Sequence, residues 1–65
     1  MKTEGLTSRQ REVRDLVVAG RTNKEAAAEL GVSERTIEAH RQVVYLKYGV
    51  HNVVGLVRKV MEGAK

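Results

Sequence analysis

The chain has 65 residues, a net charge of +4 and neither cysteine nor proline. This length allows one small domain with a thin core, and the lack of cysteine excludes disulfides, thiolate zinc sites and thiol nucleophiles. The positive charge suits a polyanionic partner, and because no apolar run or secretory signal indicates a membrane or export, we expect a cytoplasmic protein.

The first predicted helix begins after Thr7 and ends at Gly20. Thr7 and Gln10 form the capping-box pattern T-x-x-Q, in which each side chain accepts a hydrogen bond from the backbone of the other residue. The side chains expected to form its core-facing stripe are Leu6, Val13, Leu16 and Val17. Its predicted outer face consists of Arg9, Arg11, Glu12, Arg14 and Asp15.

A helix, a sharp turn and a second helix are predicted by the segment NKEAAAELGVSERTI, which starts at Asn23. Thr22 and Glu25 repeat the capping box, and the Ala and Glu residues that follow favour helix. Gly31 can adopt the left-handed conformation that ends a helix, and Ser33 can cap the next one. A tight helix pair of this kind presents its second helix outward, often into the major groove of DNA.

The second helix of the pair should span residues 34–48, because Gly49 stops it. Its 100° step turns Ile37, Val44 and Tyr48 toward the core, with His40 and Arg41 flanking them. The outward side then consists of Arg35, Ala39, Gln42 and Leu46, with Glu38 and Val43 beside them. Gln can pair with adenine and Arg with guanine, and a carboxylate can accept from the cytosine amino group. The alternative interpretation of this side is an ordinary solvated helix face.

The last predicted helix covers residues 53–62, with Asn52 as its cap, and is more apolar than one small core requires. Leu56 and Val60, together with Val50, fit its inner side. The remaining apolar residues form a second set, here called the spare stripe: Val53, Val54, Val57 and Met61. We expect a twofold dimer contact through this stripe, and the alternative is that a further domain covers it.

These elements predict an all-α fold of four helices, with residues 1–65 as a single domain. His40 and His51 are the only histidines and lack ligand spacing, so we expect no metal and no cofactor. Glutamates four residues apart occur on exposed helix faces, but neither a nucleophile nor a pocket accompanies them. We therefore do not expect an enzyme.

The spacing of motifs across all four helices resembles the LuxR/FixJ-type helix-turn-helix. The residues that carry this resemblance are LTSRQREV (6–13), Gly20, TNKEAAAELGVSERTIEAHR (22–41), Lys47, Gly49, Val50, Asn52 and Leu56. The family is the four-helix DNA-binding domain of quorum-sensing regulators and of many response regulators, and Glu38 is typical of its FixJ-like branch. Region 4 of bacterial sigma factors resembles only the first half of the pattern.

The resemblance implies a role for each matching residue. Base-facing positions are expected at Glu38, Ala39, Gln42 and Val43. Contacts with the DNA backbone are expected from Lys24, Ser33, Arg35, Thr36, His40, Arg41, Lys47 and Asn52. Two positions in this helix depart from the usual pattern, since Val43 and Leu46 stand where relatives carry polar or basic groups. Tyr48 replaces the usual Leu and should fill the same core position, with its hydroxyl at the edge.

The predicted function is sequence-specific binding of double-stranded DNA, as the output domain of a bacterial transcriptional regulator that is dimeric on a roughly palindromic site. The alternative function is a protein-interaction module that docks a receiver domain or an RNA polymerase subunit. The chain is compatible with a whole small protein or with an excised domain, to which the family often attaches a receiver or ligand-binding domain upstream.

Overall fold

The computed structural model describes residues 5–63, and all regular structure in this range is helical. The helices are α1 (Ser8–Val18), α2 (Asn23–Leu30), α3 (Glu34–Tyr48) and α4 (Val53–Gly63). The prediction of a four-helix, all-α fold is therefore confirmed, and the predicted helix boundaries agree with the structure to within two residues.

Side chains cap the N-termini of α1 and α2, as the sequence predicts. Thr7 Oγ1 accepts from the Gln10 backbone N–H at 3.1 Å, and Gln10 Oε1 accepts from the Thr7 N–H at 3.0 Å. Thr22 and Glu25 form the same reciprocal pair at the start of α2. Each pair satisfies two backbone donors that have no partner inside the helix, which fixes where the helix begins.

The turn between α2 and α3 depends on a glycine. Gly31 has φ +70° and ψ +34°, a left-handed conformation that is costly for any residue with a Cβ. The chain reverses there, and the Val32 N–H bonds back to the Ala27 carbonyl at 3.0 Å. Ser33 Oγ then accepts from the Thr36 N–H at 3.1 Å and starts α3. The predicted helix-turn-helix is therefore present.

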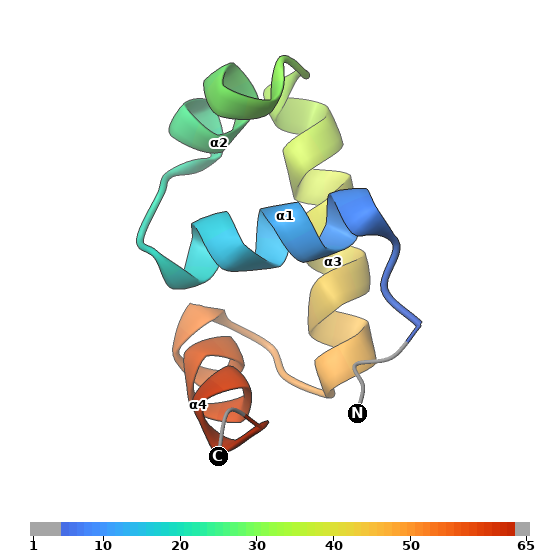
Figure 1. Cartoon of the computed structure of the whole chain (residues 1–65), viewed down its shortest axis with the longest axis vertical. Helices are drawn as coiled ribbons and strands as arrows, with labels where there is room; N and C mark the ends of the chain where they lie inside the picture. Colours follow the sequence, from blue (N-terminus) through green and yellow to red (C-terminus); the bar gives the residue numbers. More distant parts are fainter. Residues whose placement is uncertain (1–4, 64–65) are drawn as a thin grey trace.

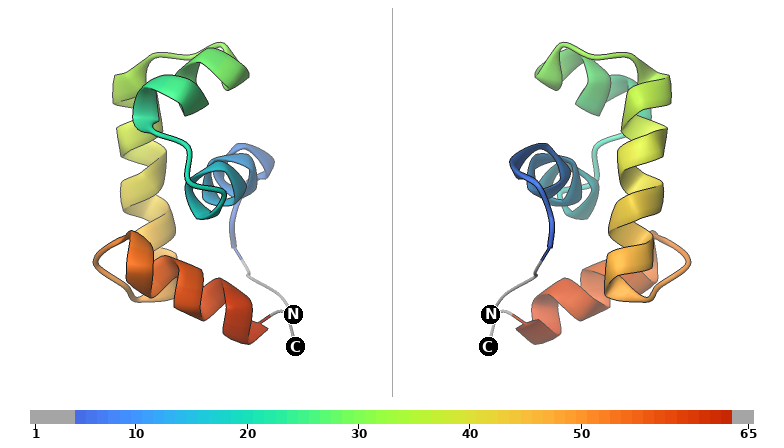
Figure 2. Two further views of the ribbon diagram at one scale, coloured as in Figure 1. Left: turned by 90° about the vertical axis from the view of Figure 1, so that its left-hand side faces the viewer. Right: turned by 90° about the vertical axis from the view of Figure 1, so that its right-hand side faces the viewer.

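The longest helix, α3, lies along one edge of the molecule. In Figure 1, α2 lies at one end of α3 and α4 at the other, while α1 crosses between them. The side views of Figure 2 show the other three helices extending to the same side of α3. Helix α3 packs against each of α1, α2 and α4, so one of its sides belongs to the core and the other is left outward.

The core is small and draws on every helix. Its centre consists of side chains with no exposed surface, Val13, Ile37, Val44 and Leu56. Leu6, Val17, Ala26 and Ala27 complete the buried cluster, and the half-buried Tyr48 packs against it, as predicted. Ala26 and Ala27 let α2 approach α3 closely because neither side chain extends beyond a methyl group.

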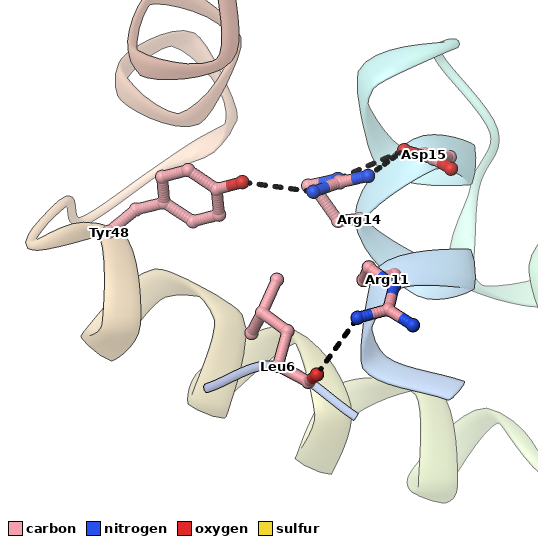
Figure 3. A network of polar contacts seen from close by, with 5 residues as sticks. All are labelled: Leu6, Arg11, Arg14, Asp15 and Tyr48. Atoms are coloured by element: carbon pink, nitrogen blue, oxygen red, sulfur yellow. Dashed lines mark hydrogen bonds and ion pairs between the residues drawn. The ribbon is translucent and has the colours of Figure 1, made fainter. Parts of the chain in front are cut away.

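Arg14 corrects one prediction about α1. The sequence pattern assigned it to the outer face, but its side chain is only 18% exposed. Its Nη1 donates to the Tyr48 hydroxyl at 3.1 Å, and its Nε donates to Asp15 at 2.9 Å (Figure 3). The long methylene stem of Arg14 can cover apolar surface while its guanidinium reaches polar partners at the edge of the core.

The start of α4 is closed by Asn52, as predicted, since its Oδ1 accepts from the Gly55 N–H at 2.8 Å. A Cβ on Gly55 would lie 3.1 Å from the Val50 Cβ, so this glycine allows the loop of residues 49–52 to fold closely against α4. Val50, Val53 and Val60 then pack against the core around the buried Leu56. Val53 therefore contacts the core, although the sequence pattern placed it in the spare stripe.

Candidate nucleic-acid interface

The outward side of α3 presents the residues that the sequence expects to face bases. Glu38, Ala39 and Gln42 are exposed, whereas Val43 is half-buried. Leu46, one turn beyond Gln42, is 78% exposed and extends the same side with an apolar group. The side therefore combines a carboxylate, an amide and small or apolar groups, a set able to contact the edges of several base pairs.

Two hydroxyl groups lie together at the N-terminus of α3. Ser33 Oγ and Thr36 Oγ1 are 3.0 Å apart, so one of the two donates to the other. Because only one hydroxyl hydrogen is used in this contact, the second hydroxyl can donate to another acceptor. The N-terminal end of a helix also favours anions, so this pair is chemically suited to a phosphate oxygen.

Arg41 is half-buried, and its guanidinium is held at the contact between α2 and α3. Its Nη1 donates to Oδ1 of Asn23, the first residue of α2, and its Nη2 donates to the Tyr45 hydroxyl at 2.7 Å. Its guanidinium carbon also lies 5.7 Å from the centre of the Tyr45 ring, within the range of a cation–π contact. Hydrogen bonds to a charged donor contribute about 1.5–3 kcal/mol each, so this arrangement is well defined.

These residues surround a shallow, open hollow between the start of α2 and the middle of α3. It has a volume of about 240 Å³ and is lined by Asn23, Glu38, Arg41, Gln42 and Tyr45. Neither Asn23 nor Tyr45 is among the residues that the sequence pattern predicts to contact DNA. The spacing of Arg41 and Tyr45 by four residues could have indicated their contact, whereas the approach of Asn23 depends on how α2 and α3 pack.

The remaining residues expected to contact the DNA backbone lie on α2, on α3 and in the loop before α4. Lys24 is exposed on the first turn of α2. Lys47 lies near the C-terminal end of α3. Its Nζ is close to Gly5, since a Cβ added to that glycine would lie 3.1 Å from it. Asn52 uses its carbonyl oxygen as a cap, which leaves its amide N–H groups able to donate. His40 is half-buried and Arg35 is exposed.

The helix-turn-helix segment has no net charge of its own. Residues 22–48 contain four basic side chains (Lys24, Arg35, Arg41 and Lys47) and four glutamates (Glu25, Glu29, Glu34 and Glu38). The net positive charge of the chain therefore comes from residues outside this segment. A surface of this kind attracts phosphates through a few placed cations, not through a broad basic field.

Part of the apolar surface of α4 remains uncovered. Val54 is 70% exposed and Met61 is 63% exposed, while Val57, between them on the same side of the helix, is half-buried. With Val53 packed on the core, the exposed part of the spare stripe consists of Val54, Val57 and Met61.

The described part of the chain has neither a cluster of metal-binding side chains nor a membrane-spanning helix. Among residues 5–63, no group of three or more His, Cys, Asp or Glu side chains could hold a metal ion. None of the helices described here has both the length and the apolar character needed to cross a bilayer.

Comparison with known proteins agrees with this geometry. A family model described as bacterial regulatory proteins, luxR family, matches residues 4–60. The transcriptional regulatory protein MctR of Rhizobium johnstonii is 40% identical over 60 residues, which are 92% of this chain and 28% of MctR. UhpA of Escherichia coli is 40% identical over 62 residues, which are 95% of this chain and 32% of UhpA. FixJ of Rhizobium meliloti is 39% identical over 62 residues, which are 95% of this chain and 30% of FixJ.

The chain spans about a third of the length of these relatives, which are named as transcriptional regulators. No solved structure matches it significantly.

Proposed function

The chain belongs to the LuxR family of bacterial regulatory proteins, as a helix-turn-helix domain of transcriptional regulators, and from this premise we propose that it binds double-stranded DNA sequence-specifically. In this proposal α3 enters the major groove. Glu38, Ala39, Gln42 and Val43 face the base edges. DNA in a bacterium lies in the cytoplasm, so the proposal also places the protein there.

The observation that carries the proposal is the position of α3. It lies along one edge of the molecule, with the other helices on one side, so its outward side is open along its length (Figure 2). A major groove about 12 Å wide admits one α-helix, and the exposed Glu38 and Gln42 are one turn apart on that side. The hydroxyl pair at Ser33 and Thr36 would then lie at a phosphate.

We further propose that the protein binds as a twofold dimer through α4, with Val54, Val57 and Met61 at the contact. The zero net charge of residues 22–48 supports this, because a helix-turn-helix with few phosphate contacts gains little affinity from electrostatics alone. Two joined copies on half-sites about 34 Å apart would combine two weak contacts into one strong one. The expected operator is therefore roughly palindromic.

The alternative function is a protein-interaction module, in which the same surfaces dock a receiver domain or a polymerase subunit. The exposed Leu46, Val54 and Met61 are the observations that favour it. The two functions respond differently to salt: DNA binding weakens steeply as salt rises, whereas an apolar protein contact does not.

The experiment is binding-site selection from random duplex DNA, followed by footprinting and titration of the selected site over a range of salt. A selected palindrome, protected on both halves and bound less tightly at higher salt, supports the proposal. Recovery of random sequence with uniform weak binding would contradict sequence specificity, and a selected site without internal symmetry would contradict the dimer.

A further inference from the structure

Two alternatives compete for the Arg41 guanidinium: Glu38 on α3, or Asn23 on α2 together with Tyr45 on α3. Glu38 is three residues before it, a spacing at which an arginine and a glutamate on a helix can form an ion pair. The structure shows a different pairing, in which Arg41 donates to Asn23 Oδ1 and to the Tyr45 hydroxyl. Within residues 5–63, no hydrogen bond or ion pair engages the Glu38 carboxylate.

The preference of Arg41 follows from the two environments. An exposed ion pair between neighbouring turns is weak, because water and salt screen it and because both side chains lose freedom. The hydrogen bonds to Asn23 and Tyr45 are partly buried and charge-assisted, and the Tyr45 ring adds a cation–π contact. We therefore expect Arg41 to keep its hydrogen bonds to Asn23 and Tyr45 as long as both residues are present.

This choice of partner affects the chemistry of Glu38. A carboxylate paired with Arg41 would have part of its acceptor capacity occupied and its charge neutralised, and it would then discriminate poorly between bases. An unpaired carboxylate at the edge of the hollow can accept from the exocyclic amino group of cytosine and is repelled by the acceptor atoms of guanine.

We propose that Asn23 and Tyr45 are positioning residues for base recognition: by holding the Arg41 guanidinium at the contact between α2 and α3, they leave the Glu38 carboxylate available to read a cytosine. The inference rests on the proposed function, since it requires α3 in the major groove. It assigns a role in specificity to two residues that do not themselves need to touch a base.

The test begins with site selection by the wild-type chain and by Glu38→Ala, which identifies the base pair that Glu38 reads. Discrimination at that base pair is then measured as the ratio of affinities for the preferred and the substituted duplex. Tyr45→Phe and Asn23→Ala should each lower this ratio by about two- to ten-fold, and the double variant should lower it further. Ratios at other base pairs should not change.

Two controls separate positioning from folding. Tyr48→Phe removes a hydroxyl that also accepts from an arginine, but this pair lies between α1 and α3 and should leave the ratio unchanged (Figure 3). Asn23→Asp keeps an acceptor oxygen for Arg41 and should retain the ratio, even though its charge weakens binding to all duplexes. A loss of folding alone would lower the affinity for all duplexes alike, and it would leave the ratio at the base pair that Glu38 reads unchanged.

A measurement without DNA completes the test. In the free protein, NMR of the arginine side chains should show restricted rotation of the Arg41 guanidinium, which the double variant releases. If the wild type selects no sequence, the proposed function fails. If it selects a sequence but Glu38→Ala leaves the selection unchanged, or if the double variant frees Arg41 without changing the ratio, only the positioning role is overturned.

Discussion

The Tyr48 hydroxyl accepts a hydrogen bond of 3.1 Å from Nη1 of Arg14, and this contact joins the end of α3 to the middle of α1 (Figure 3). Burial alone would lower the pKa of the Arg14 guanidinium, but the hydrogen bonds to Tyr48 and Asp15 and the charge of Asp15 outweigh it, so the pKa is raised. The network therefore holds a partly buried charge in place at the edge of a thin core.

Tyr48→Phe should destabilise the fold by about 0.5–1.5 kcal/mol, because Arg14 loses one partner while the ring still fills its core position. Urea denaturation monitored by circular dichroism measures the change. Glu12→Gln is the matched control: it weakens an exposed ion pair with Arg9 and should cost less than about 0.5 kcal/mol. Equal effects of the two substitutions would show that the Arg14–Tyr48 contact contributes nothing specific.

The helix boundaries were predictable because short-range chemistry determines them. The capping hydroxyls of Thr7, Thr22 and Ser33 and the left-handed Gly31 each act on backbone groups three or four residues away, so sequence spacing alone describes them. The outward position of Glu38 and Gln42 also follows from the helical period, and both are exposed.

Contacts between segments that are distant in the sequence were harder to predict from the sequence. Arg14 was expected in solvent because a charged residue usually is, and only the approach of Tyr48, 34 residues away, gives it a partner. Asn23 meets Arg41 for a similar reason, since the crossing of α2 and α3 brings them together. Val53 packs on the core because Gly55 lets the preceding loop fold closely against α4. The spacing of apolar residues in the sequence does not predict this packing.

Ser33→Ala should reduce both stability and DNA affinity. The hydroxyl caps α3 and belongs to the pair expected at a phosphate, so its loss should cost about 1 kcal/mol of folding free energy. Thr7→Ala removes the equivalent cap of α1 and should cost a similar amount without weakening DNA binding by the folded protein. Denaturation and duplex titration of both variants decide this, and equal losses of DNA affinity would contradict the phosphate contact.

Gln42→Ala should relax sequence preference at one base pair per half-site. A glutamine that pairs with a base edge contributes about 1–3 kcal/mol of discrimination at that position. Site selection with the variant measures the effect, and Gln10→Ala, which alters the other glutamine of the chain in the cap of α1, should select the wild-type sequence. An unchanged selection by Gln42→Ala would show that Gln42 does not face a base.

Lys24→Ala and Lys47→Ala should weaken binding to all sequences alike. Each lost phosphate contact should reduce the slope of log affinity against log salt by about one. Because residues 22–48 have only four basic side chains, one contact is a large share of the slope and should be measurable. Lys59→Ala, on α4, is the comparison and should retain the wild-type slope. If Lys24→Ala and Lys47→Ala also retain the wild-type slope, the ammonium groups of Lys24 and Lys47 do not contact the DNA backbone.

Val57→Glu tests the dimer, because Val57 lies between Val54 and Met61 on the exposed part of the spare stripe. Across a twofold axis the new carboxylate would face its own copy, and two like charges would be close and poorly solvated. We expect the variant to fold as a monomer by circular dichroism and sedimentation. Its affinity for a full palindrome should fall much further than its affinity for a half-site, since only a dimer gains from joined sites.

Val54→Glu is a second test of the same dimer contact. Because the Val54 side chain is 70% exposed, a charge there should not prevent folding. If Val57→Glu unfolds, Val54→Glu still decides the matter. Loss of palindrome binding in this folded variant, with half-site binding retained, supports the α4 contact. Wild-type binding to the palindrome by a folded Val54→Glu protein would place the dimer contact on another surface, since a buried charge on each protomer could not leave that contact intact.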